Sequence, residues 1–368
     1  MDDNDQVYRL LQQHLDSQPV GFPAMASGAD ITLLKRLFSP DEARLALHLP
    51  YKPTPLNRIV ERAAPGFSAD QVEGLLESMF AKGAIGWKEK SGVDHWYVIP
   101  LVVGMYENQD GQPTPEFLAD AFSYMRTPAF VGAFIAAKPT QLRTIPINES
   151  IPVEHHVATY DQIRTIVETS PGPFVALKCI CRESAAMGGK PCAVTSRVET
   201  CLGFNDLAAQ VLRRSHGREI SREEAMEILG QNEKDGLVLQ PANSLKPDFV
   251  CSCCGCCCGT LIIHKLLPKP LDFWTSNFYA EIEAEACTQC GECVSRCQVN
   301  AVSMTGPGET ALIELKRCIG CGLCVPTCPS EAVKLRRKDR EITPPPDDEA
   351  LYDQIMANRN RSRESGKQ

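Results

Sequence analysis

Apolar and polar residues between positions 39 and 81 recur at helical spacing and predict three helices. Ser39-Pro40-Asp41-Glu42 has the order of a capping box with proline in the first turn, and apolar residues follow it. A short second helix fits Leu56 to Ala63. A third is predicted after a second capping box, Ser68 to Gln71, and ends at Ala81. Its apolar positions predict one buried face, made of Val72, Leu75, Leu76, Met79 and Phe80.

Two predicted strands follow the third helix. Alternation indicates strands at Ala84–Lys88 and His95–Ile99, joined by a turn at Lys90–Asp94. Three helices and then a hairpin resemble the winged-helix regulators of the MarR-like kind, over residues 29–106. The resemblance implies that the third helix would enter a DNA groove.

The charge of that third helix argues against DNA binding. Its polar side offers Asp70, Gln71, Glu73 and Glu77, and no lysine or arginine precedes Lys82. Such a face would repel the phosphates that supply most of the affinity for DNA. The wing carries Lys88 and Lys90, which we interpret as solvated. We therefore expect the domain to dock a protein or to pack within the chain.

Composition narrows the class of protein. The chain has 368 residues, a hydrophobic fraction of 43% and a net charge of −8. These values indicate a globular chain of two or three units, and they exclude wholesale disorder and a general nucleic-acid coat protein. No apolar run reaches the roughly 18 residues that span a bilayer. The acidic start, Met1-Asp2-Asp3-Asn4-Asp5, lacks the order of a secretory signal, so we expect a cytoplasmic protein without a membrane span.

The number and the positions of the cysteines indicate metal binding. All 18 cysteines lie between Cys179 and Cys328. Cytosolic thiols are kept reduced, so a disulfide framework is excluded by the expected compartment. We therefore expect metal chemistry in the second half of the chain.

The last eight cysteines repeat one spacing. Cys287-Thr-Gln-Cys290-Gly-Glu-Cys293 leads to Cys297, and Cys318-Ile-Gly-Cys321-Gly-Leu-Cys324 leads to Cys328. Each half reads C-x2-C-x2-C-x3-C and is similar to bacterial ferredoxins with two clusters. The resemblance implies that each fourth cysteine serves the other cluster. One [4Fe-4S] cluster would then take Cys287, Cys290, Cys293 and Cys328, and the second would take Cys318, Cys321, Cys324 and Cys297. Gln298 stands where the usual proline follows the fourth cysteine, whereas Pro329 keeps it.

Ten further cysteines precede that repeat and are predicted metal ligands. Four come early and six are packed into eight residues, and together they are Cys179, Cys181, Cys192, Cys201, Cys251, Cys253, Cys254, Cys256, Cys257 and Cys258. Neighbouring side chains of an extended backbone point to opposite sides, so Cys253 and Cys254 cannot easily share a metal. We expect one or two further iron–sulfur clusters that combine early and late cysteines. Zinc binding and thiol storage remain open as alternatives.

Two weaker resemblances concern these ten cysteines. The Cys253-Cys254-Gly255 fragment resembles the CCG sequences of heterodisulfide reductase subunits, whose thiolates hold unusual clusters. The wider chain is similar to multi-cluster proteins that join a CxCR segment, a cysteine-dense run and a ferredoxin-like end. Neither resemblance implies a particular activity.

The remaining segments carry weaker predictions. Helices are predicted within Phe117–Ala137, broken near Thr127-Pro128, and over 160–168 and 205–215. A strand is predicted at Phe174–Cys179, and the small residues 184–189 suit a loop around a metal centre. Ser221 opens a helix that Gly230 should end. His155 and His156 are candidate ligands, with a surface pair as the default, and the basic residues 336–340 could guide an acidic redox partner.

Together these features predict an α+β fold in three parts. We expect a lead-in at 1–28, a winged-helix-like domain at 29–106 and a cysteine-rich α+β domain at 107–272. A ferredoxin-like dicluster domain at 273–340 and a tail at 341–368 complete the chain.

Electron transfer through iron–sulfur clusters is the predicted function. At least two [4Fe-4S] clusters would relay single electrons to or from a redox partner, a flavoprotein or another oxidoreductase subunit. The chain has no P-loop, no GxGxxG after a strand and no convincing nucleophile–base pair, so a stand-alone enzyme is less favoured. Two alternatives stay open: a redox-sensing winged-helix regulator, and a catalytic subunit with an unusual cluster at 251–258.

Overall fold

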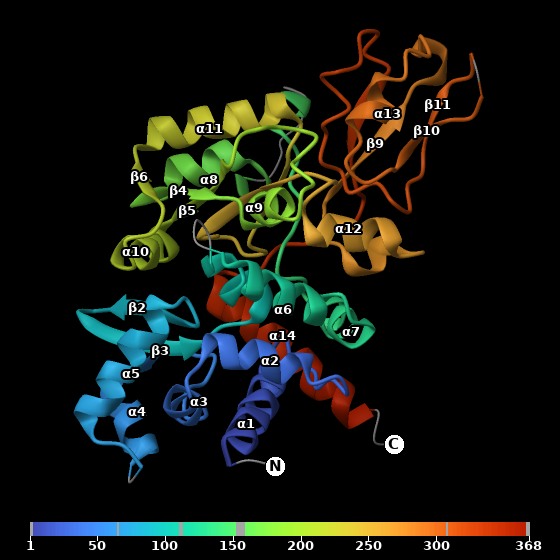
Figure 1. Ribbon diagram of the computed structural model, residues 1–368. Helices are drawn as coiled ribbons and strands as arrows, with labels where there is room; N and C mark the ends of the chain where they lie inside the picture. The colour runs from blue at the N-terminus through green and yellow to red at the C-terminus, as the bar shows by residue number, and fades with distance from the viewer. Residues whose placement is uncertain (1–2, 65, 110–112, 152–158, 307, 366–368) are drawn as a thin grey trace. The chain divides into compact units, whose positions relative to one another are not determined.

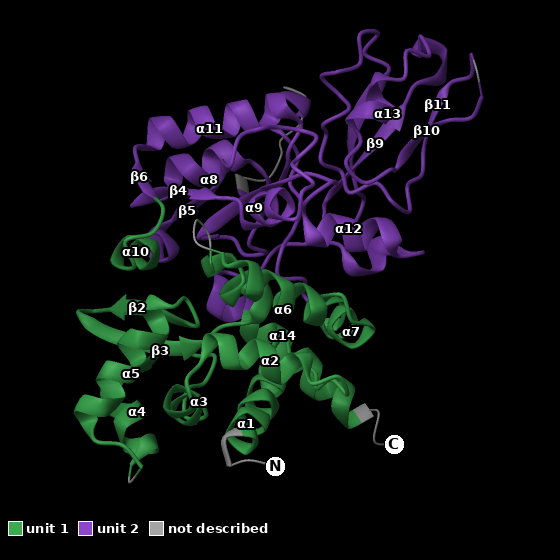
Figure 2. Ribbon diagram, in the orientation of Figure 1, with its two compact units in different colours: residues 1–138, 209–217, 352–368 green, residues 139–208, 218–351 purple. Residues whose placement is uncertain are grey.

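The structure is a computed structural model and describes residues 3–64, 66–109, 113–151, 159–306 and 308–365. The chain forms two compact units (Figure 2). The first contains residues 1–138, 209–217 and 352–368, and the second contains residues 139–208 and 218–351. The predicted histidine pair, His155 and His156, lies outside the described residues.

The first unit begins with a helical layer. Helix α1 packs against α2 and α3 through buried residues such as Leu11 and Leu15. The capping box predicted at Ser39 is confirmed, because the Ser39 hydroxyl accepts from the Glu42 N–H and the Glu42 carboxylate accepts from the Ser39 N–H. The helices of this layer are α1 (Asp3–Ser17), α2 (Ala29–Leu37) and α3 (Pro40–Ala46).

A small antiparallel sheet and two helices follow in the same unit. Strand β3 (Val93–Val98) pairs with both β1 (Thr54–Pro55) and β2 (Ile85–Lys90). The hairpin turn is shorter than predicted, because Ser91 and Gly92 both take positive φ and close it tightly. Helices α4 (Leu56–Ala63) and α5 (Ala69–Ala81) lie on either side of a short connection.

Helix α5 has the predicted division of faces. Ser68 caps it through the expected box with Gln71. Val72, Leu76, Met79 and Phe80 are buried, while its acidic positions are exposed.

Three further helices complete the first unit. The expected break is confirmed, since α6 ends before Thr127 and the Thr127 hydroxyl caps α7. Residues of α14 within this unit contact the segment between α3 and β1, where Asp353 pairs with Lys52 and accepts from the Tyr51 hydroxyl. These helices are α6 (Pro115–Met125), α7 (Pro128–Ala136) and α14 (Asp348–Ser365).

The second unit is built on a five-stranded antiparallel sheet of order β6-β4-β5-β8-β7. Figure 1 labels β4, β5 and β6 of this sheet. Its buried residues include Val175, Leu202, Phe204 and Val250. The strands are β4 (Phe174–Lys178), β5 (Glu199–Phe204), β6 (Arg218–Ile220), β7 (Val238–Pro241) and β8 (Phe249–Cys253).

Two local predictions for this unit are wrong. The small residues 184–189 do not form a loop throughout, because Ile180–Met187 is helix α9 and only Gly188 and Gly189 end it. The helix opened by Ser221 does not stop at Gly230 but continues as α11 (Arg222–Asp235). Its last turn contributes buried Asn232 and Glu233, and Gly236, at φ 86°, is the residue that caps it.

Three further helices flank the strands along the chain. Helix α8 (Ile163–Thr169) precedes β4, and α12 (Gly259–Leu266) follows β8. Helix α10 (Asn205–Arg213) lies between β5 and β6 in the sequence, and its residues 209–213 belong to the first unit.

The end of the second unit consists of two small antiparallel pairs of strands and the short helix α13 (Glu292–Arg296). Strand β9 (Phe278–Ile282) pairs with β12 (Val333–Arg337), and β10 (Val302–Met304) pairs with β11 (Ala311–Ile313). The sequence predicts four strands in a pseudo-symmetric repeat, and the observed strands agree with them to within two residues at each end. The predicted strands are Phe278–Ala284, Ala301–Thr305, Ala311–Leu315 and Ala332–Leu335. Across the described residues, no helix has both the length and the apolar content to cross a membrane.

Candidate metal centres

Four cysteines from both halves of the repeat line one pocket. Cys287, Cys290 and Cys293 come from the loop before α13 and from α13 itself, and Cys328 comes from the second half. The other lining residues are apolar or small and include Ile282, Ala311 and Val333. These four are the set that the ferredoxin resemblance assigns to one cluster. The thiols of Cys287, Cys290 and Cys328 act with burial to raise the pKa of Cys293, which places all four within electrostatic range.

The second set gathers around Cys324, which is buried. Burial raises its pKa well above the ordinary value, and the nearby thiols of Cys321, Cys318 and Cys297 raise it further. Burial likewise raises the pKa of Cys321 to about 12. Cys318 and Cys324 are buried and Cys297 and Cys321 are half-buried. Buried thiolates need a compensating cation, and an iron–sulfur cluster supplies it.

Backbone donors already point at two of these sulfurs. The Ala280 N–H donates to Cys318 Sγ at 3.3 Å, and the Ala301 N–H donates to Cys297 Sγ at 3.2 Å. Hydrogen bonds to ligand sulfurs stabilise the anionic form and tune the potential of a cluster. The donor set and its surroundings therefore fit a cubane of iron and sulfide.

The chain packs tightly around this second set. Gly320 has φ 65°, and a Cβ there would lie 2.2 Å from the Phe278 carbonyl oxygen. The equivalent residue of the first half is Gln289, which has nearly the same φ of 63° but carries a side chain. Only the second half therefore requires glycine at this position.

The ten upstream cysteines divide into two groups. The cysteine quartet consists of Cys192, Cys254, Cys256 and Cys257, whose Sγ atoms all lie within 4.8 Å of one another. The six-cysteine ring consists of the others, in which neighbouring thiols shift one another's pKa in the order Cys179, Cys181, Cys258, Cys253, Cys251, Cys201 and back to Cys179.

The division follows from the backbone. Cys251 and Cys253 share one side of strand β8, and the chain leaves the strand at Cys253. Cys253 and Cys254 consequently fall into different groups, in agreement with the expectation that they cannot share a metal. Both groups join early and late cysteines.

A buried arginine lies beside both groups. The side chain of Arg182 on α9 is 2% exposed, and it donates to Thr200 Oγ1 and to the Ser252 carbonyl. Cys179 and Cys201 of the ring and Cys254 and Cys192 of the quartet all contribute to raising the pKa of Arg182 against the opposing effect of burial. Its partners are neutral groups and thiols, so the nearby thiolates are the anions that can balance its charge.

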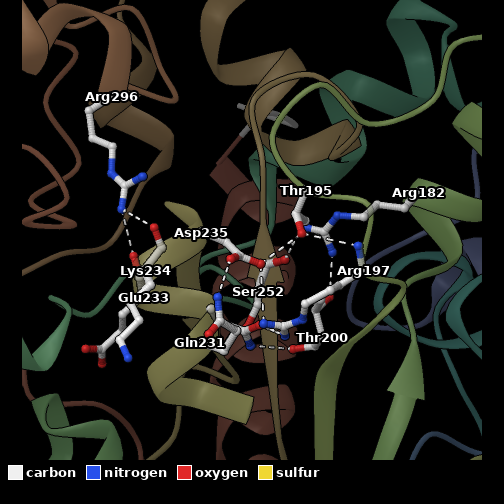
Figure 3. Close-up of polar contacts among 11 residues, drawn as sticks. Arg182, Thr195, Arg197, Thr200, Gln231, Glu233, Lys234, Asp235, Ser252 and Arg296 are labelled. Atoms are coloured by element: carbon white, nitrogen blue, oxygen red, sulfur yellow. Dashed lines mark hydrogen bonds and ion pairs between the residues drawn. The ribbon is translucent and has the colours of Figure 1, made fainter. Parts of the chain in front are cut away.

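A polar network around α11 holds the two strands that carry ring cysteines (Figure 3). Asn232 is fully buried and donates at 2.8 Å both to the Thr200 carbonyl and to Ser252 Oγ. Thr200 precedes Cys201 on β5, and Ser252 lies between Cys251 and Cys253 on β8. The amide therefore fixes the register at the positions where the ring cysteines project.

The same helix fixes the segment that follows Cys192. Thr195 donates to Asp235 at 2.8 Å, and Arg197 forms an ion pair with Asp235 at 3.3 Å. Burial opposes ionisation of Cys192, but the N–H groups of Thr195 and Val194 and the Arg182 side chain lower its pKa to about 6. A thiol in this setting is already prepared to act as a thiolate ligand.

Arg296 and Gln298 are among the residues that join the cysteine-rich part to the dicluster part within the second unit. Arg296, next to Cys297, donates at 2.8 Å to the Glu233 and Lys234 carbonyls at the end of α11 (Figure 3). The Gln298 side chain accepts from the Gly255 N–H at 2.8 Å, and a Cβ on Gly255 would lie 2.1 Å from the Gln298 carbonyl oxygen. The residue that replaces the usual ferredoxin proline is therefore the contact with the cysteine-dense run.

The basic residues at the end of β12 and just after it are largely paired within the second unit. Arg336 pairs with Glu281 and Glu283, and Arg337 pairs with Glu341. Lys338 donates to the Ser276 carbonyl. The structure thus gives these side chains local partners, which weakens the predicted role in guiding an acidic protein.

The sequence alone assigns no role to the residues around the candidate metal ligands. Two of them do have a sequence signal, because Arg182 is the arginine of the CxCR segment and Gln298 is a departure from the ferredoxin pattern. Asn232, Asp235 and Arg296 carry no sequence signal, because their partners come from distant elements.

Comparison with known proteins agrees with the geometry of the last eight cysteines. Residues 276–343 match the family model of the 4Fe-4S dicluster domain, and the rest of the chain lies outside that match. No curated protein and no solved structure is significantly similar to the chain. The second unit thus carries an iron–sulfur dicluster domain of ferredoxin type, next to a separate cysteine-rich region.

Proposed function

We propose that the chain transfers single electrons between a partner oxidoreductase and two [4Fe-4S] clusters. The observation that carries the proposal is the pocket shared by Cys287, Cys290, Cys293 and Cys328, because it joins three ligands of one repeat to the last ligand of the other. A bound [4Fe-4S] cluster supplies one-electron exchange with little rearrangement. Cys318, Cys321, Cys324 and Cys297 hold the second cluster in this proposal.

The protein residues contribute the environment of each cluster. Buried Cys318 and Cys324 exclude water from the second site, and the Ala280 and Ala301 N–H groups hydrogen-bond its sulfurs. The first site has more exposed ligands, since Cys290 is exposed and Cys287 and Cys328 are half-buried. We expect the more exposed cluster to exchange electrons with the partner, a flavoprotein or another oxidoreductase subunit.

The six-cysteine ring is the proposed position of one further iron–sulfur cluster. Six thiols exceed the four that a cubane needs, so some of them would be spare or would ligate an unusual cluster. Eighteen cysteines fit a reducing compartment such as the cytoplasm.

For residues 29–106 we propose a winged-helix-like domain that docks protein rather than DNA, between the lead-in at 1–28 and the cysteine-rich domain at 107–272. The order of α4, α5, β2 and β3 supports the winged-helix interpretation. Within the first unit Arg213 pairs with Glu77 of α5 at 2.6 Å and lies 4.3 Å from the centre of the Trp87 ring. This part of the α5 face is already engaged by a protein side chain, which supports docking of protein.

The test is a reductive titration of anaerobically purified full-length protein, followed by electron paramagnetic resonance. The account predicts one electron per dicluster cluster and signals from two interacting centres. Cys328→Ala should remove the cluster held by Cys287, Cys290 and Cys293, with a loss of about four irons and matching sulfide. Thr288→Ala, in the lining of the same pocket but without a thiol, is the matched control and should leave the signals unchanged. Wild-type protein that holds no acid-labile sulfide would refute the proposal.

A further inference from the structure

The cysteine quartet differs from the other cysteine groups in how close its sulfurs lie. Cys192 Sγ is 3.5 Å from Cys254 Sγ and 3.7 Å from Cys256 Sγ. Cys256 Sγ is 3.5 Å from Cys254 Sγ and 3.6 Å from Cys257 Sγ. In the part of the chain that the structure describes, this is the one group of three or more ligand side chains whose donor atoms all lie within 4.8 Å.

These distances match a single metal ion. Four sulfurs at about 2.3 Å from a tetrahedral zinc ion lie about 3.8 Å from one another. A cubane holds its four thiolates farther apart, because an iron–sulfur core separates them. The two dicluster sets provide an internal comparison, since neither meets the 4.8 Å limit that the quartet meets. The quartet is thus too compact for a third cubane.

The backbone explains how neighbouring cysteines reach one point. The chain leaves β8 at Cys253 and turns through residues 255–257, so Cys256 and Cys257 are not on opposite sides of a strand. Gly255 allows this turn to press against the Gln298 carbonyl, where any side chain would clash. Cys192 completes the set from a segment that Thr195 and Arg197 tie to Asp235 of α11.

The surrounding charge favours four ionised sulfurs. Zinc with four thiolates carries a net charge of −2, which calls for a cation nearby. Arg182 is buried beside Cys192 and Cys254, and among the described residues its hydrogen bonds go to the neutral Thr200 and Ser252. On the other side of the run, the Lys265 ammonium donates to the Gly255 carbonyl.

We propose that Cys192, Cys254, Cys256 and Cys257 bind one zinc ion as a structural site, separate from every iron–sulfur cluster of the chain. The ion links the segment after α9 to the turn after β8. This inference does not depend on the proposed electron transfer, because the ion takes no part in redox chemistry.

The test counts zinc, iron and acid-labile sulfide in full-length protein purified without oxygen, for the wild type and for Cys192→Ser. The proposal predicts about one zinc per chain in the wild type, lost in Cys192→Ser while iron and sulfide stay unchanged. Ser196→Ala, an exposed neighbour in the same segment, should keep all three values. Loss of iron instead of zinc, or no change in any metal, would overturn the proposal.

A second measurement on the wild type covers the case in which Cys192→Ser does not fold. X-ray absorption at the zinc edge should show four sulfur neighbours at about 2.3 Å. Nitrogen or oxygen neighbours, or an absence of zinc, would contradict the assignment. Electron transfer by the dicluster domain can fail in a separate assay while this result stands.

Discussion

The dicluster domain and the cysteine-rich region lie in one unit, yet their cysteines assemble by different routes. In the proposed assignment, each dicluster repeat supplies three ligands from one short loop and exchanges only the fourth, so spacing along the chain predicts the groups. The upstream cysteines come from β4, α9, β5, β8 and the turns after them. Their division into a ring and a quartet depends on which side of a strand each residue faces. A compact motif can therefore be identified from sequence, whereas a distributed site needs the fold.

The largest expected effect distinguishes the two dicluster repeats from each other. Gly320→Ala should destabilise the protein by about 3 kcal/mol or more and impair loading of the second cluster, because the new Cβ meets the Phe278 carbonyl at positive φ. Gly291 also has positive φ, but a Cβ there would meet no atom within 4 Å. Gly291→Ala should therefore lower the free energy of unfolding by about 1 kcal/mol. Anaerobic chemical denaturation and iron content measure both. Equal losses of stability in the two variants would show that positive φ alone, and not the contact with the Phe278 carbonyl, determines the cost.

The next prediction concerns the hydrogen bonds that Asn232 makes to the strands that carry upstream cysteines. Asn232→Ala leaves the Thr200 carbonyl and Ser252 hydroxyl without their buried donor and should cost about 3 kcal/mol. Metal in the ring should fall while the dicluster iron is retained. The neighbouring Gln231→Ala loses one exposed hydrogen bond to Asp235 and should stay within about 0.5 kcal/mol of wild type. If Asn232→Ala kept its stability and its metal content, the proposed role of the network would be wrong.

The contact between the two regions gives a smaller effect. Gln298→Ala removes the acceptor of the buried Gly255 N–H and should cost about 1 to 2 kcal/mol. Gln298→Glu keeps an oxygen of the same reach and should recover most of that loss. Thermal unfolding under anaerobic conditions measures both variants, and a Gln298→Glu variant no better than Gln298→Ala would argue against the hydrogen bond.

A pH dependence is expected from α12. Burial, aided by the charge of Arg317, lowers the pKa of His264 from 6.5 to about 4. The folded chain therefore keeps His264 neutral at a pH where the unfolded chain binds a proton. The free energy of unfolding should fall as pH drops from about 6.5 towards 4. His264→Gln should lose this part of the dependence, and an unchanged pH profile in that variant would contradict it.

Several features could be predicted from sequence because their causes are local. The capping boxes at Ser39 and Ser68 and the break at Thr127 depend on residues within one helical turn, and all three are confirmed. The dicluster domain was predicted from its cysteine spacing.

Other features depend on tertiary contacts and could not be predicted in this way. Gly230 looks like a helix stop, but burial of Asn232 and Glu233 extends the helix to Gly236. The role of Gln298 needs Gly255 beside it, and 43 residues separate the two. The division of the ten upstream cysteines needs the pairing of β5 with β8.

The central claim is that the last eight cysteines hold two cubanes that accept electrons. The most direct measurement is iron, acid-labile sulfide and electron uptake per chain on one anaerobic preparation. We predict at least about eight irons with equal sulfide, and one electron accepted for each four-iron cluster. Fewer than about eight irons in fully loaded protein, or iron without sulfide, would contradict the account.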